Sequence, residues 1–164
     1  MQPCKHSGQP PNGFSLIELL VVVAMVSILA SIGLPLAELA HRRTQEEELR
    51  QSLRQIRSAL DAYKKATDAG QIVRQVNASG YPSSLDVLVT GVVDAQSPRG
   101  SKLFFLRRLP RDPFAPDAID APAQTWGLRS YESTAEEPKP GKDVFDIYSK
   151  SEGAGMNGVP YRKW

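Results

Sequence analysis

The hydrophobic and polar positions divide the chain into stretches with different patterns. After a polar start, residues 14–36 are almost continuously apolar, and Glu18 is the one charged side chain among them. Residues 37–69 mix polar and apolar positions at helical spacing and contain no proline or glycine, whereas proline and glycine interrupt the chain repeatedly from residue 70 onward. We expect a polar leader at 1–13, an apolar helix at 14–36, an amphipathic continuation at 37–69 and a small α+β domain at 70–164.

The apolar stretch is about as long as the roughly 20 residues that a membrane helix needs. Glu18 lies near its start, and an ionised side chain deep in hydrocarbon costs roughly 2.5–3.5 kcal/mol, so it needs a partner or access to the headgroups. A secretory signal peptide has a shorter apolar core and a small-residue cleavage site, which this stretch lacks. Pro35 has no backbone N–H, so we expect it to kink or locally melt the helix near residues 32–33.

An apolar stripe continues along the amphipathic part of the helix. Its members, spaced by four, three, four and three residues, are Leu49, Leu53, Ile56, Leu60 and Tyr63. This spacing places them on one helical face, which we expect to pack against the C-terminal domain and not in a coiled coil. Arg42 and Glu46 occupy the next positions upstream, in a charged cluster at residues 41–48 that we expect to be a solvated face. Gly70 is the expected end of the helix.

Short elements are expected in the C-terminal domain. A helix should begin at Ser83 or Ser84 and turn its leucines inward. Strand patterns occupy residues 125–131 and 144–149, joined by a long charged connection at 132–142, which predicts a hairpin. A third short strand is expected at 159–164. Two prolines force an extended or turning path between Pro110 and Phe114.

Composition excludes several classes of function. The net charge is +2 with acidic and basic residues interspersed, which argues against nucleic acid as the main partner. The single cysteine, Cys4, permits neither an internal disulfide nor a cysteine-based zinc site, and no apolar stretch precedes it as a lipoprotein signal would. The two histidines, His6 and His41, form no catalytic arrangement with serine or cysteine, so we expect no enzyme activity.

Residues 13–22, GFSLIELLVV, resemble the N-terminal motif of type IV pilins and of the pseudopilins of type II secretion. The resemblance implies that a prepilin peptidase cleaves between Gly13 and Phe14 and that Phe14 is then N-methylated. It also implies that Glu18, the fifth residue after cleavage, acts in assembly by meeting the new amine of Phe14 in a neighbouring subunit. Pro35 falls where many pilins carry a helix-bending proline.

Shorter segments of the C-terminal domain resemble the major pseudopilin. They are Tyr81-Pro82, the turn from Leu109 to Phe114, the run from Phe145 to Ser149, and Trp164. Major pseudopilins usually bind calcium in the loop that follows, here residues 150–158, but this loop offers only Glu152 and Asn157 as side-chain ligands beside hydroxyls and carbonyls. Calcium takes six to eight oxygen ligands. We therefore expect no cofactor, with calcium at this loop left open.

The resemblance implies a single-pass protein of the bacterial inner membrane with its C-terminal domain in the periplasm. Its partners would be the prepilin peptidase, an inner-membrane assembly platform, and copies of itself and other pseudopilins in a filament that drives protein export. Two alternatives stay open. A minor type IV pilin would share the N-terminal motif, whereas a single-span anchored binding module that never polymerises would keep its leader and tolerate loss of Glu18.

Overall fold

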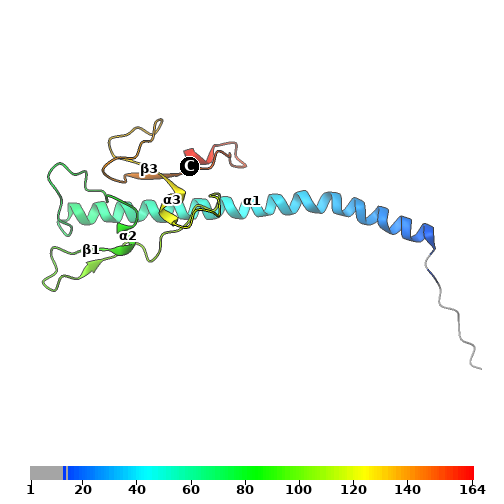
Figure 1. The fold of residues 1–164 in the computed structure, drawn as a ribbon, viewed down its shortest axis with the longest axis horizontal. Coiled ribbons are helices and arrows are strands. Elements are labelled where there is room, and N and C mark those ends of the chain that lie inside the picture. Colours follow the sequence, from blue (N-terminus) through cyan, green and yellow to red (C-terminus); the bar gives the residue numbers. More distant parts are fainter. Residues whose placement is uncertain (1–12, 14) are drawn as a thin grey trace, which may run out of the picture. The chain divides into compact units, whose positions relative to one another are not determined.

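The computed structural model describes residue 13 and residues 15–164, and it divides the chain into two units, Met1–His41 and Arg42–Trp164. Helix α1 (Leu16–Asp68) contributes to both units, and it is the regular structure found among the described residues of the first. We call the second unit the head unit. With the short strands of this head unit, the chain has the expected α+β, pilin-like fold (Figure 1).

The head unit adds short elements to the second half of α1. In chain order they are α2 (Val87–Thr90), β1 (Val92–Val93), β2 (Lys102–Leu103), α3 (Pro122–Thr125), β3 (Trp126–Arg129), β4 (Asp146–Ser149) and the 3-10 turn η1 (Tyr161–Lys163). Strands β1 and β2 form one antiparallel pair, and β3 and β4 form another. Figure 1 shows α2 with β1 on one side of α1 and β3 on the other.

The β3–β4 hairpin confirms the predicted strand pair. Trp126 lies opposite Ser149 and Arg129 opposite Asp146, so the register keeps Trp126 and Ile147 buried, each with 1% of its surface exposed. Alternation along β4 places Ile147 and Ser149 inward and their neighbours partly outward. Each strand has four residues in the structure, so both are shorter than the predicted ranges 125–131 and 144–149.

The apolar stripe of α1 forms one wall of the core. Leu49, Leu53, Ile56 and Leu60 are at most 2% exposed, and Tyr63 is partly buried beside them. They pack in one cluster with buried residues from several later segments of the head unit: Leu85, Leu88, Leu106, Trp126, Val144, Ile147 and Tyr161. The predicted packing of this stripe on the C-terminal domain is confirmed.

Gly70 ends the regular hydrogen bonding of α1, as predicted. Its φ of +75° lies in the left-handed region that side chains disfavour. The amide of Gly70 donates to the carbonyl of Thr67 at 3.0 Å and that of Gln71 to the carbonyl of Ala66 at 3.0 Å. These bonds satisfy carbonyls that have no partner within the helix.

The turn between Pro110 and Phe114 is fixed by a buried carboxylate. Asp112 is 1% exposed and accepts hydrogen bonds from the Ser149 hydroxyl at 2.6 Å and the Phe114 amide at 2.8 Å. Its own amide donates to the Thr125 hydroxyl at 3.1 Å. The turn is thereby joined to α3 and to the end of β4, and the buried charge is satisfied by hydrogen bonds.

Two predicted elements differ in the structure. The helix expected from Ser83 or Ser84 begins only at Val87 after Asp86 and lasts one turn, although Leu85 and Leu88 are buried as expected. The third strand expected at 159–164 is wrong: an isolated bridge joins Pro160 to Ala154, and the 3-10 turn η1 follows. Proline at 160 supplies no amide for a strand ladder. The strand pair β1–β2 and the single turn α3 are not predicted from the sequence. Elements of two to four residues are too short to show a periodic pattern of apolar side chains.

The buried stripe leads to a test of the core. Ile56→Ala should destabilise the head unit by about 2–5 kcal/mol, because it removes buried methyl groups from a packed site. Gln55→Ala, one position away on the exposed surface of the same helix, should stay within about 0.5 kcal/mol of the parent. Urea unfolding of the full chain in detergent, followed by tryptophan fluorescence, measures both. Equal losses for the two variants would show that this face is not the core.

Candidate functional site

The predicted processing site lies at the edge of the described residues. Gly13 is exposed, and Phe14 lies outside the described residues. Glu18 is exposed in the first turn of α1, where the partial positive charge of the helix N-terminus favours a carboxylate. Among the residues that the structure describes, Glu18 has no ion-pair partner.

The first unit leaves its apolar side chains uncovered. Leu16 is 81% exposed, Met25 61% and Leu29 71%, and all the described residues from 15 to 31 are exposed. By length and composition, the helix is long and apolar enough to cross a membrane. An apolar surface of this extent requires a lipid or protein environment outside the chain.

Pro35 lies inside α1, and residues 32–35 keep a helical backbone around it. Local melting at residues 32–33 is therefore not observed, while the kink assigned to Pro35 stays a prediction.

Ser27 and Ser31 donate their hydroxyls to carbonyls one turn back, at 2.7 Å each, so both polar side chains are satisfied within the helix. Glu18, the one charged side chain of the apolar stretch, has no ion-pair partner among the described residues and still needs one.

The charged cluster at 41–48 is not uniformly solvated, which corrects the prediction. Glu46 is only 3% exposed, and its Oε1 accepts hydrogen bonds from the Met156 amide at 2.8 Å and the Tyr161 hydroxyl at 3.1 Å. Arg42 and Arg50 approach its carboxylate to 3.7 Å and 3.6 Å from one turn before and one turn after. The carboxylate is thus buried with both hydrogen-bond donors and opposite charges around it.

Three arginines of α1 hold the C-terminal segment. Arg42 donates to the Ala154 carbonyl and to the Tyr161 hydroxyl, the guanidinium of Arg50 lies 4.3 Å from the centre of the Trp164 ring, and Arg57 donates to the main-chain oxygen of Trp164 at 2.7 Å. The hydrogen bond to Tyr161 raises the pKa of Arg42 above its ordinary value. Arg42 therefore stays charged wherever the protein is folded.

Arg57 also links the helix to the sheet. Its Nε lies 2.8 Å from Oδ1 of Asp146, whose other oxygen lies 3.1 Å from a guanidinium nitrogen of Arg129. Asp146 therefore joins α1, β3 and β4 in one charged network that is partly shielded from water.

The calcium ligands considered for the loop 150–158 are not brought together. Glu152 is exposed, and the Asn157 side-chain oxygen already accepts the Val159 amide at 3.1 Å. Within the described residues no group of three or more histidine, cysteine, aspartate or glutamate side chains is placed to hold a metal. Calcium needs six to eight oxygens, several from carboxylates, so the residues present do not fit it.

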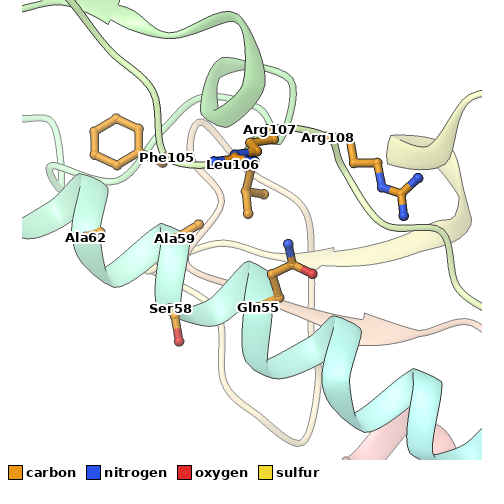
Figure 2. Close-up of a pocket in the computed structure, with 8 residues that line it drawn as sticks. All are labelled: Gln55, Ser58, Ala59, Ala62, Phe105, Leu106, Arg107 and Arg108. Carbon is orange, nitrogen blue, oxygen red and sulfur yellow. The ribbon is translucent and has the colours of Figure 1, made fainter.

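An open hollow lies beside the exposed edge of α1 in the head unit (Figure 2). Its lining comprises Gln55, Ser58, Ala59, Ala62, Phe105, Leu106, Arg107 and Arg108. Figure 2 shows Ala59 pointing toward Leu106 and the Ser58 side chain pointing away from that segment. This lining has no acid, histidine or cysteine to pair with the serine as a catalytic site would require.

Sequence reasoning missed Glu46 although its position carried a signal. Glu46 lies three residues before Leu49 and continues the apolar stripe by one turn, so it belongs to the buried face of α1. A charged residue in that register, flanked at four residues on each side by arginine, indicates a buried and paired carboxylate.

Comparison with known proteins agrees with the N-terminal motif. Residues 11–34 match the prokaryotic N-terminal methylation motif. The chain is 30% identical to type II secretion system core protein G of Pectobacterium carotovorum subsp. carotovorum over 116 residues, which cover 68% of this chain and 67% of that protein. It is 26% identical to the protein of the same name from Klebsiella michiganensis over 140 residues, covering 82% of this chain and 90% of that protein.

No solved structure matches this chain at a significant level. Both relatives are named as secretion-system core proteins and neither as an adhesive pilus subunit or an enzyme. The matched regions extend well beyond the N-terminal motif that all pilin-like proteins share, and therefore include the head unit. The chain belongs to the type II secretion system core protein G family, a family of pseudopilins.

Proposed function

We propose that this pseudopilin is inserted in the bacterial inner membrane by α1, with the head unit in the periplasm, and assembles into a filament that drives protein export. The observation that carries the proposal is the N-terminal motif on a helix whose apolar side chains at the described residues 15–31 are exposed. Lipid would cover this surface before assembly, and neighbouring helices would cover it in the filament. A structural role of this kind requires no catalytic residue.

Glu18 is proposed to select the register of assembly. Cleavage after Gly13 would create a free amine on Phe14 in or near the bilayer, a second charge that needs compensation. A subunit that enters with a stagger would bring its Glu18 carboxylate to the Phe14 amine of a neighbour, so that two unpaired charges become one pair. The exposure of Glu18 and its lack of an ion-pair partner among the described residues support this proposal.

The proposed partners follow from the same features. A prepilin peptidase would remove residues 1–13 and methylate Phe14, an inner-membrane platform would add subunits, and other pseudopilins would join copies of this chain in the filament. The match to core protein G over most of the chain favours this function over that of a minor type IV pilin. A binding module that never polymerises is not favoured either, because it would need no methylation motif.

Processing is tested by the intact mass of the protein from cells with and without a prepilin peptidase. We expect loss of residues 1–13 and gain of one methyl group only when the peptidase is present. Gly13→Val should keep the full-length mass because it adds bulk beside the cleaved bond, whereas the control Gly8→Val, away from that bond, should be processed normally. A full-length mass in the presence of the peptidase would contradict the proposed leader.

The role of Glu18 is tested by Glu18→Ala in cells that form the filament. We expect normal cleavage but a loss of about 150- to 5,000-fold in filament incorporation, because an unpaired buried charge costs about 3–5 kcal/mol. Quantitative immunoblotting of sheared filaments measures it. Glu38→Ala removes another exposed acid of the first unit and should assemble at the parent level. Equal incorporation of both variants would remove Glu18 from the assembly mechanism.

A further inference from the structure

The loop at residues 150–158 and the segment after it are held by side chains of α1. Resemblance to major pseudopilins implies a calcium ion in this loop, yet the loop lacks a fitting ligand set. We infer that Arg42 and Glu46 of α1 close this loop in place of a metal ion, so that the head unit keeps its fold without calcium. This inference concerns the single subunit and does not depend on the proposed filament.

Glu46 supplies the anionic part of the closure. Its Oε1 accepts the Met156 amide at 2.8 Å from inside the loop and the Tyr161 hydroxyl at 3.1 Å from just beyond it. A carboxylate that is 3% exposed and carries these two bonds fixes the loop and the segment after it to one point on the helix. Hydrogen bonds to a charged acceptor are among the stronger ones in proteins.

Arg42 supplies the cationic part. Its guanidinium donates to the Ala154 carbonyl within the loop, so a main-chain oxygen already faces a positive charge from the protein itself. The Arg42 Nε also donates to the Tyr161 hydroxyl at 3.4 Å. Loop carbonyls are the groups that would complete a calcium shell, and a fixed guanidinium beside one of them repels a divalent cation.

Charge and space around the loop favour the same conclusion. The Glu46 carboxylate is shared by Arg42 and Arg50, so its charge is not available to attract a cation. Gly155 has no room for a Cβ, which would lie 2.3 Å from the Trp164 ring. The loop is packed directly against an aromatic ring that lies 5.1 Å, centre to centre, from that of Tyr161.

The loop is further closed by its own backbone. The Gly155 amide donates to the Val159 carbonyl at 2.8 Å, and the Tyr161 amide donates to the Gly153 carbonyl at 3.0 Å. The two carbonyls therefore point into internal hydrogen bonds, and the Asn157 side chain bonds to the Val159 amide. Oxygens committed in this way are poor candidates for a shared metal shell.

The first experiment uses the parent chain in detergent and needs no variant. Its thermal unfolding midpoint is measured in 1 mM CaCl₂ and in 1 mM EGTA at equal ionic strength, with MgCl₂ as the matched divalent control. We expect midpoints within about 1 °C in the three solutions, a shift well below what 1 kcal/mol of binding would give. A calcium-specific rise of about 4 °C or more would overturn the inference.

The second experiment removes the helix side chain. Glu46→Ala should lower the midpoint by about 5 °C or more, because it leaves the buried Tyr161 hydroxyl and the partly buried Met156 amide without their acceptor. Hydrogen exchange of residues 150–158 should accelerate by about tenfold or more. The control is Glu47→Ala. Glu47 is the next residue along the helix, and its side chain is 63% exposed, so its loss should shift the midpoint by about 1 °C or less.

Glu46→Gln separates the hydrogen bonds from the charge, because it keeps an acceptor oxygen and removes the ion pairs. We expect a midpoint between those of the parent and Glu46→Ala. If Glu46→Ala behaves like Glu47→Ala, and the loop exchanges at the parent rate, then Glu46 does not close the loop and the inference is wrong.

Discussion

The burial of one face of α1 between Glu46 and Leu60 is the constraint on which the head unit depends. None of the other elements could form a core alone, since each strand has at most four residues and α2 and α3 have one turn each. Isolated strand pairs of this length are marginal in water. The helix supplies a preformed apolar wall, and α2, the 104–109 segment and the β3–β4 hairpin become stable by packing against it.

The sequence predicts those parts of the fold that have a period. The stripe from Leu49 to Tyr63 is long enough to identify its buried face, and the hairpin is indicated by two β-rich runs around a charged connection. The short elements were mistaken or missed because their geometry is set by tertiary hydrogen bonds. Asp112 holds its turn partly through the Ser149 hydroxyl, 37 positions away, and no local pattern indicates a contact so distant in sequence.

The same reasoning explains what was found and missed at the candidate sites. The methylation motif is local, so the roles proposed for Gly13, Phe14, Glu18 and Pro35 rest on spacing and resemblance alone and stay predictions. The closure of the C-terminal loop joins Arg42 and Glu46 to residues more than a hundred positions away. From the sequence, only the position of Glu46 in the apolar stripe indicates that its side chain is buried. Its partners come from the C-terminal segment, whose packing against α1 cannot be predicted from a local pattern.

Two glutamates of α1 show how one residue type serves opposite purposes. Glu46 is surrounded within its own head unit by two arginines, an amide and a hydroxyl, so its charge is compensated before any second subunit arrives. Glu18 has no such ion-pair partner among the described residues and lies on a helix surface that is otherwise apolar. A buried charge with partners is tolerated within a fold, whereas an unpaired charge in an apolar environment is costly until a partner is supplied. The distribution of partners along one helix therefore separates a part whose buried charge is compensated within the head unit from a part whose charge has no ion-pair partner among the described residues.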